Sequence, residues 1–170
     1  MSKSNQESKD NYSIMNIKVA ILGKSFVGKT ALIYKFISDK IPTEYDPTDE
    51  DHYKVNMTIE GINCQLEVLD TGGQDEFQTM MDSWIEFGNC FLLVYSIGDA
   101  ESFKQIKEKY ERICKIKNEE NLSFIIVGNK CDLPENERVV KREEAEEYAK
   151  SNGLEFLESS ALNKINVKEV

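Results

Sequence analysis

The chain has 170 residues, 40% of them apolar and 31% charged, which suits one folded domain with a buried core. It carries 21 Lys and Arg against 31 Asp and Glu, so its net charge at pH 7 is −10. This charge argues against nucleic acid as a partner and against binding to a bare anionic membrane, and it favours basic protein partners. Because the sequence has neither an export signal nor an apolar run of roughly 18 residues, we expect a cytoplasmic protein whose cysteines stay reduced.

The first 14 residues are polar and lack a hydrophobic period, which predicts a disordered leader before one domain over residues 15–170. From Ile17 onward, short apolar runs alternate with amphipathic segments, as in βα units stacked on a parallel sheet. We therefore expect an α/β fold with a six-stranded, mostly parallel sheet and helices on both faces. Strands are predicted over 17–22, 53–60, 64–69, 91–96, 124–128 and 154–159, and four helices are expected, three of them over 30–37, 103–117 and 142–153.

The last residues carry the pattern of a helix start. Asn166 can act as an N-cap, and Glu169 stands three residues later, as in a capping box. Since the chain stops at Val170, we expect the last helix of the domain to be incomplete and one face of the sheet to lose part of its cover.

A phosphate-binding loop is predicted between the first strand and the first helix. The segment Gly23–Thr30, GKSFVGKT, matches G-x-x-x-x-G-K-[ST] in that structural context. Its glycines let backbone N–H groups converge on phosphate oxygens, the helix N-terminus adds partial positive charge, and Lys29 adds a full charge. The Thr30 hydroxyl suits a Mg²⁺ ion that bridges two phosphates. The alternative is an ordinary glycine-rich turn.

The strands predicted over 53–60 and 64–69 flank Gly61-Ile62-Asn63 and are expected to form a hairpin, and a second acidic element follows it. Asp70 ends an alternating strand just before Thr71-Gly72-Gly73-Gln74, which is a Walker-B position beside the expected metal. The Gly73 N–H can reach a terminal phosphate, and Gln74 can hold an attacking water in line. An Asp at a strand end before a glycine turn is ordinary by itself, but the phosphate loop favours the functional interpretation.

The segment Asn129-Lys130-Cys131-Asp132 directly follows a predicted strand, at the sheet edge where ligands of parallel α/β folds bind. The Asp132 carboxylate can accept hydrogen bonds from the ring N–H and the exocyclic amine of guanine, whereas adenine offers no matching pair of donors. Guanine is thus favoured over adenine, which disfavours a small P-loop kinase or ATPase. A polar βα turn without a ligand is the alternative.

The segments GxxxxGKT, YDPTxEDxY, DTxGQ, NKCD and SA occur with the order and spacing of a Ras-family small GTPase, and the chain resembles that family through Ala161. The resemblance implies the small G-protein version of the P-loop NTPase fold and a monomeric state. It also implies a switch in signal transduction that binds GTP or GDP with Mg²⁺ as cofactor and hydrolyses GTP slowly.

The resemblance assigns roles to individual residues, with guanine held by the NKCD segment and the backbone of Ser160-Ala161 closing over the base. The implied metal ligands are Thr30, Thr48 and, through water, Asp70, and the implied catalytic residues are Gln74, Lys29 and Gly73. The implied nucleotide contacts are Gly23, Ser25, Phe26, Val27, Gly28, Lys29, Thr30, Ala31, Tyr45, Pro47, Thr48, Gly73, Asn129, Lys130, Asp132, Leu133, Ser160, Ala161 and Leu162.

Two segments resemble the family's switches, namely residues 45–53 for switch I and residues 71 to about 81 for switch II, which the γ-phosphate orders. The implied partners are protein effectors, an exchange factor and a GTPase-activating protein that supplies an arginine. Attachment to the cytoplasmic face of a membrane would need a lipidated C-terminal tail beyond this chain. The implied effector contacts are Thr48, Asp49, Glu50, Asp51 and Tyr53.

Ser25 and Phe26 depart from the family pattern, because this part of the loop is commonly Gly-Gly in Ras proteins. Their bulk leads us to expect a weakened response to an activating protein. Ile41 replaces an aromatic ring that usually stacks on guanine, and Leu162 replaces a lysine, so we expect faster GDP release. These departures leave one alternative open, a nucleotide-locked or pseudo-GTPase scaffold that binds guanine nucleotide without significant hydrolysis.

Asp49 also departs from the pattern, because Ras proteins usually carry a hydrophobe there. Together with Glu50 and Asp51 it makes a run of three acids. A solvated loop would explain such a run, and so would a partner with a basic face that pairs with the edge strand.

Overall fold

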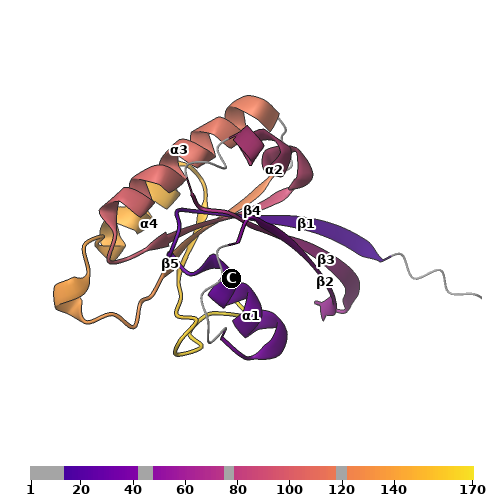
Figure 1. The fold of residues 1–170 in the computed structure, drawn as a ribbon, viewed down its shortest axis with the longest axis horizontal. Helices are drawn as coiled ribbons and strands as arrows, with labels where there is room; N and C mark the ends of the chain where they lie inside the picture. Colours follow the sequence, from indigo (N-terminus) through magenta and orange to yellow (C-terminus); the bar gives the residue numbers. More distant parts are fainter. Residues whose placement is uncertain (1–13, 42–47, 75–78, 118–121) are drawn as a thin grey trace, which may run out of the picture.

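The computed structural model describes residues 14–41, 48–74, 79–117 and 122–170 (Figure 1). In this part of the chain six strands form one sheet in the order β2-β3-β1-β4-β5-β6, and every neighbouring pair is parallel except β2 and β3. The predicted α/β fold with a mostly parallel sheet is confirmed. The strands are β1 (Met15–Leu22), β2 (Glu50–Ile59), β3 (Ile62–Thr71), β4 (Cys90–Ser96), β5 (Ser123–Asn129) and β6 (Glu155–Glu158). The helices are α1 (Lys29–Ser38), α2 (Met81–Phe87), α3 (Ala100–Lys117) and α4 (Arg142–Ser151), with a 3₁₀ turn η2 (Glu135–Glu137) before α4.

Helices cover both faces of the sheet. In Figure 1, α2, α3 and α4 lie on one face and α1 lies on the other. Side chains of β1 alternate between the two sides: Ala20 and Leu22 pack into the core under α2, α3 and α4, whereas Ile21 packs into the core under α1. Burial on two faces explains why this central strand is an almost continuous apolar run.

The hairpin of β2 and β3 differs from the prediction in its turn. The turn residues are Glu60 and Gly61, with φ angles of 49° and 82°, and Ile59 pairs directly with Ile62. Two consecutive positive φ angles are typical of the type I′ turn, whose twist matches that of the flanking strands. The predicted connection over residues 61–63 is therefore wrong.

Strand β2 starts earlier than predicted. It runs from Glu50 rather than from Tyr53, because Glu50 pairs with Thr71 and Asp51 pairs with Asp70 of β3. The sheet order places β2 at the edge, where a strand can accept a further strand. Two of the three acids in the run thus belong to the edge strand and not to a loop.

Capping decides where two helices begin and end. α3 starts three residues before its predicted start, because the Asp99 Oδ1 atom accepts hydrogen bonds from the N–H groups of Glu101 at 3.0 Å and Ser102 at 3.2 Å. Helix α4 ends at Ser151, two residues before its predicted end, because Gly153 has a φ of 67° and its N–H donates to the Lys150 carbonyl at 3.2 Å.

The chain end forms a turn and not the predicted helix start. Asn166 has a φ of 51°, outside the extended conformation of an N-cap residue, and its Nδ2 atom donates to the Glu158 carbonyl at 2.8 Å. The Val170 N–H donates to the Asn166 carbonyl at 3.2 Å and closes the turn. Val167 and Val170 pack against the core under α1 and cover part of that face.

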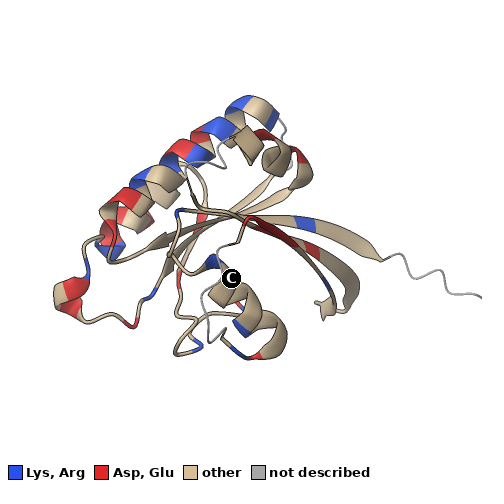
Figure 2. Ribbon diagram, viewed as in Figure 1, with Lys and Arg blue, Asp and Glu red and all other residues tan. Residues whose placement is uncertain are grey.

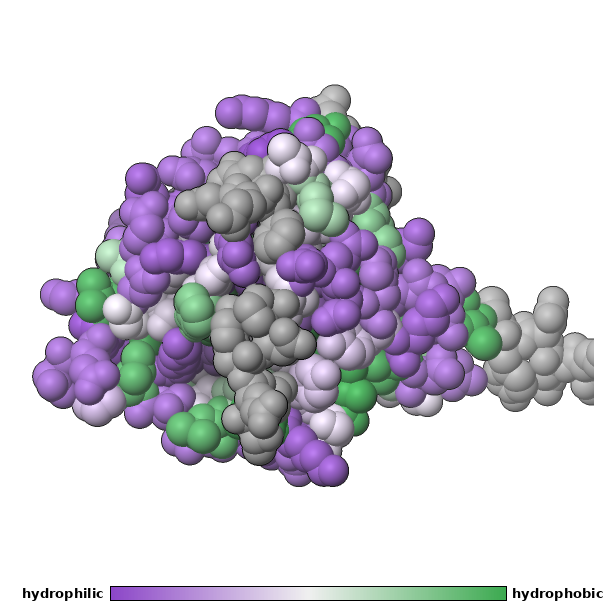
Figure 3. Space-filling view, in the orientation of Figure 1, coloured by the Kyte–Doolittle hydropathy of each residue, from purple (hydrophilic) through white to green (hydrophobic). Residues whose placement is uncertain are grey.

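The surface is largely hydrophilic on the side drawn in Figure 3, with hydrophobic residues scattered over it. Figure 2 shows Lys and Arg interspersed with Asp and Glu along α3. Helix α4 also carries both signs of charge, and there Arg142 pairs with Glu146 at 2.7 Å, one helical turn apart. Among the described residues, no helix combines the length and the apolar character needed to cross a bilayer.

We expect Gly61→Ala to lower the free energy of unfolding by about 1 kcal/mol, because a left-handed conformation is strained for alanine. An added Cβ atom at Gly61, where φ is 82°, would have no heavy atom within 4 Å, so steric contact contributes nothing. Chemical denaturation measures the difference. The control is Glu60→Asn, which gives the Asn-Gly pair preferred in type I′ turns and should not destabilise the protein. Equal losses in both variants would contradict the turn assignment.

Candidate functional site

The predicted phosphate loop lies between β1 and α1 and packs on the ends of β4 and β5. An added Cβ atom at Gly23 would lie 2.2 Å from the Val94 carbonyl oxygen. At Gly28, where φ is 96°, a Cβ atom would lie 2.5 Å from the Asn129 Nδ2 atom. Only glycine therefore fits at these two positions of the motif.

Lys29, the first residue of α1, is buried, with 6% of its surface exposed. Its Nζ atom donates hydrogen bonds to the carbonyl oxygens of Gly23 and Lys24, each at 3.2 Å. Burial lowers the pKa of the ammonium group to about 8, although the charge of Asp70 partly opposes this shift. A buried cation at a helix N-terminus is suited to a polyanionic ligand.

Three oxygen-bearing side chains meet beside Lys29. The Thr30 hydroxyl donates to the Asp70 Oδ2 atom at 2.6 Å and lies 3.1 Å from the Thr48 hydroxyl. Asp70 is completely buried, its Oδ1 atom has no hydrogen-bond partner in the described part of the chain, and burial raises the pKa of its carboxyl group. An unpartnered carboxylate oxygen next to two hydroxyls fits a hard divalent cation such as Mg²⁺.

Backbone hydrogen bonds join three segments at the phosphate loop. The Ser25 N–H donates to the Gly73 carbonyl at 3.1 Å, and the Gly72 N–H donates to the Asp49 carbonyl at 2.8 Å. A Cβ atom at Gly73 would lie 2.3 Å from the Ser25 nitrogen, so glycine is required for this approach. Gln74 follows directly, which places the predicted catalytic glutamine beside the loop.

The predicted guanine segment is tied to the phosphate loop and to the end of β6. Asn129 is buried at the end of β5, donates from Nδ2 to the Val27 carbonyl at 2.8 Å and accepts at Oδ1 from the Ser159 hydroxyl at 3.2 Å. The Ser160 hydroxyl donates to the Asp132 Oδ1 atom. The NKCD segment and the SA segment therefore form one connected unit, as their shared predicted role requires.

The other residues predicted to contact the nucleotide differ in how exposed they are. Phe26, with a φ of 65°, exposes 69% of its surface and Leu162 exposes 68%. Lys130, with a φ of 64°, is half-buried. Tyr45 and Pro47 lie outside the described residues. Side chains that pack into a core are those of Val27, Ala31 and Ala161 under α1 and of Leu133 on the opposite side.

Comparison with known proteins gives the family. The family model described as Ras family matches residues 18–170. The chain belongs to the Ras family. It is 42% identical over 156 residues to the Ras-like protein rasS of Dictyostelium discoideum, and the alignment covers 92% of this chain and 80% of that protein. As a Ras-family member, the chain is a small GTP-binding switch protein and a GTP hydrolase.

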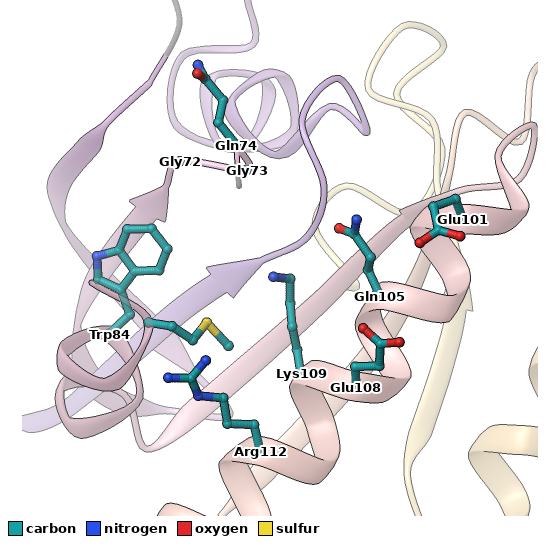
Figure 4. A pocket seen from close by; sticks show the side chains of 10 residues that line it. Gly72, Gly73, Gln74, Trp84, Glu101, Gln105, Glu108, Lys109 and Arg112 are labelled. Carbon is teal, nitrogen blue, oxygen red and sulfur yellow. The ribbon is translucent and has the colours of Figure 1, made fainter. Parts of the chain in front are cut away.

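A groove that the sequence did not predict separates α3 from the segment that resembles switch II of the Ras family (Figure 4). Lys109 extends from α3 toward Gly73, whereas the Gln74 side chain extends away from α3. The charge of Lys109 also contributes to the low pKa of Lys29. Helix α3 therefore places the Lys109 ammonium group close to the phosphate loop. Neither a sequence motif nor the hydrophobic period of the helix predicted this position.

Glu50, a predicted effector contact at the start of β2, is bonded to neighbouring side chains. Its Oε1 atom lies 2.9 Å from the His52 Nε2 atom, and its Oε2 atom accepts from the Trp84 Nε1–H of α2 at 2.7 Å. The hydrogen bonds from His52 and Trp84 lower the pKa of the Glu50 carboxyl group. Among the acids of the run, Asp49 and Asp51 are the exposed members.

We expect Lys29→Met to stabilise the nucleotide-free protein at neutral pH by on the order of 2–3 kcal/mol, because it removes a buried ammonium group. The pKa of Lys29 falls from 10.5 to about 8, so the folded parent binds fewer protons than the unfolded chain between these values and gains stability as the pH rises. The advantage of the variant should thus be full below about pH 8 and fade toward pH 10.5. Denaturation of both nucleotide-free proteins over this range measures it, and a constant difference would contradict it.

Proposed function

We propose that this chain binds GDP and GTP with Mg²⁺ at the phosphate loop, and that the γ-phosphate sets the conformation of the two switch segments for protein effectors. One observation carries the proposal: the buried Asp70 Oδ1 atom has no hydrogen-bond partner among the residues that the structure describes, and it lies in a cluster with the Thr30 and Thr48 hydroxyls and the buried Lys29 ammonium group. Such a cluster of buried charges is costly unless a cation and an anion occupy it together.

The Thr30 and Thr48 hydroxyl oxygens would hold the cation, and Asp70 would act through a bridging water. Among the described residues, no group of three or more His, Cys, Asp or Glu side chains could hold a metal, so the other ligands would be phosphate oxygens and water. When bound, Mg²⁺ supplies positive charge that neutralises the phosphates. Cation and nucleotide would therefore bind cooperatively.

The NKCD and SA segments would select the base. Asp132, oriented by the Ser160 hydroxyl, would accept from the ring N–H and the exocyclic amine of guanine. Lys130 and the backbone of Ser160-Ala161 would flank the base. Asn129 would act mainly by holding the guanine-binding segments at a constant distance from the phosphate loop. Its Nδ2 atom bonds to Val27 of that loop and its Oδ1 atom bonds to Ser159, which precedes Ser160.

For hydrolysis, Gln74 would orient a water molecule toward the γ-phosphorus, while Lys29 and the Gly73 N–H would donate to γ-phosphate oxygens. The water oxygen forms a bond to phosphorus as the bond to the β–γ bridging oxygen breaks, giving GDP and phosphate. A GTPase-activating protein would add an arginine to the transition state, and an exchange factor would accelerate GDP release.

Effectors would bind along β2, the edge strand. Its exposed Asp51 and the preceding Asp49 suit a partner with a basic face, which could also extend the sheet. Because Glu50 of β2 is hydrogen-bonded to Trp84 of α2, a movement of α2 would displace the start of β2 and so change the proposed effector surface.

A second candidate function is a scaffold that binds guanine nucleotide without turnover. The observation that favours it is Phe26, which has a φ of 65° in the phosphate loop and exposes 69% of its surface next to Ser25. A bulky side chain in this part of the phosphate loop can exclude the attacking water or the arginine of an activating protein without preventing nucleotide binding.

We expect Gln74→Leu to slow phosphate release in single-turnover GTP hydrolysis by about 10-fold or more, because the side chain that orients water is lost. Affinity for GTP, measured by a fluorescent analogue, should change far less. The matched control is Gln65→Leu on β3, since Gln65 donates to Asn56 at 3.0 Å and lies in the hairpin outside the proposed site. Tight GTP binding by the parent with no measurable turnover would establish the scaffold instead.

We expect Asp70→Asn to raise the Mg²⁺ concentration that half-maximally slows GDP release by about 10–100-fold, because a positioning carboxylate is lost. In the Mg²⁺-free and nucleotide-free protein, the same change should raise stability, since burial raises the pKa of the Asp70 carboxyl group and makes its charged form unfavourable. Asp82→Asn is the control, because Asp82 is an exposed acid on α2. An unchanged Mg²⁺ dependence in Asp70→Asn would refute the assignment.

A further inference from the structure

An ion pair connects two loops that are distant in sequence. The Lys164 Nζ atom lies 2.7 Å from the Asp39 Oδ2 atom, although the two residues are 125 positions apart. Asp39 follows the last residue of α1, and Lys164 belongs to the loop after β6 that contains Ser160. The pair therefore bridges the end of the helix that begins at the phosphate loop and the predicted guanine loop.

The guanine loop is closed on itself, so the position of Lys164 fixes the position of Ser160. Ser160 and Ile165 exchange two backbone hydrogen bonds of 3.0 Å each, and the Asn163 N–H donates to the Ser160 Oγ atom at 3.0 Å. The same Ser160 hydroxyl donates to the Asp132 carboxylate. Holding Lys164 thus holds the acid that is proposed to bind the base.

The other end of the pair is equally connected. Helix α1 has 10 residues and spans about 15 Å, with Lys29 and Thr30 at its start and Asp39 at its end. Asp39 also lies 3.2 Å from the Lys35 Nζ atom, which anchors its carboxylate to the helix. The ion pair consequently closes a ring that runs from the phosphate loop along α1 and back through the guanine loop.

We propose that Lys164 and Asp39 are positioning residues that hold the guanine loop against the end of α1 and slow the release of bound nucleotide. This inference rests on the proposed function. The pair would matter more in this chain because Leu162, at a predicted base contact, exposes 68% of its surface. The electrostatic attraction between Asp39 and Lys164 would then compensate for part of the nucleotide affinity that a buried base contact would provide.

Backbone conformation and charge support this role. Asp39 and Lys164 both have positive φ angles, of 57° and 56°, a conformation that lysine adopts rarely and that surrounding contacts must maintain. The hydrogen bond from Lys164, followed by that from Lys35, lowers the pKa of the Asp39 carboxyl group. Since Asp39 and Lys164 expose 59% and 47% of their side chains, salt should weaken the pair.

The test is the release rate of a fluorescent GDP analogue from the parent, Asp39→Asn, Lys164→Gln and the double variant. Asparagine tolerates the left-handed conformation at position 39, so the first variant removes charge without strain. We expect each single variant to release GDP about 2–5-fold faster, the range for an exposed ion pair, with association unchanged. The double variant should release GDP no faster than the faster single variant, since each single substitution already removes the same ion pair.

Salt separates this role from a general loss of stability. Raising the ionic strength should accelerate release from the parent toward the rate of Asp39→Asn and leave that variant nearly unaffected. The matched control is Glu146→Gln, which removes an exposed acid paired with Arg142 at the same distance of 2.7 Å on α4. Its release rate should equal that of the parent.

Two failures can be told apart. If the parent itself binds no guanine nucleotide in the presence of Mg²⁺, the proposed function is wrong. If the parent binds GDP but the four proteins release it at equal rates, or if the effects of the two single variants simply multiply, then the function stands and the positioning role of the pair is refuted.

Discussion

The burial of opposite charges at the start of α1 is the constraint on which the rest of the structure depends. Lys29 donates to carbonyl oxygens of its own loop, and the Asp70 Oδ1 atom has no partner in the described part of the chain, so neither charge is well compensated. A polyphosphate with its cation would complement both groups. Because only the folded state can bind such a ligand, stability and nucleotide concentration should be strongly linked in this protein.

Hydrogen bonds between loops hold this costly arrangement together. Asn129 bonds the end of β5 to the phosphate loop, and the Gly73 carbonyl bonds the same loop to the segment after β3. Both contacts need glycine on one side, at Gly28 and at Gly73, because any side chain would collide with the neighbouring segment. The parallel sheet provides the geometry, since it brings the carboxyl ends of β1, β3, β4 and β5 to one edge.

Two further contacts connect this centre to the parts that are expected to move. Trp84 of α2 binds Glu50 of β2, and Lys164 of the guanine loop binds Asp39 at the end of α1. The exposed pair of Lys164 and Asp39 contributes little to stability, so it can be exchanged at low cost, whereas Trp84 is buried and its bond to Glu50 couples α2 more firmly to β2. The two contacts link opposite sides of the site, the effector strand and the base.

The sequence alone determined the fold class and predicted the phosphate loop, the metal-site role of Asp70 and the NKCD segment, because hydrophobic period and the spacing of glycine, lysine and aspartate are local properties. The sequence shows the acidic run at the start of β2 but could not show that Glu50 is bonded to Trp84. The predicted positions of the hairpin turn and of the start of α3 were wrong. Only the tertiary structure decided the groove with Lys109, the double bonding of Asn129 and the pairing of Asp39 with Lys164. Each of these joins residues far apart in the chain, and such contacts follow from how the elements pack, which no local pattern encodes.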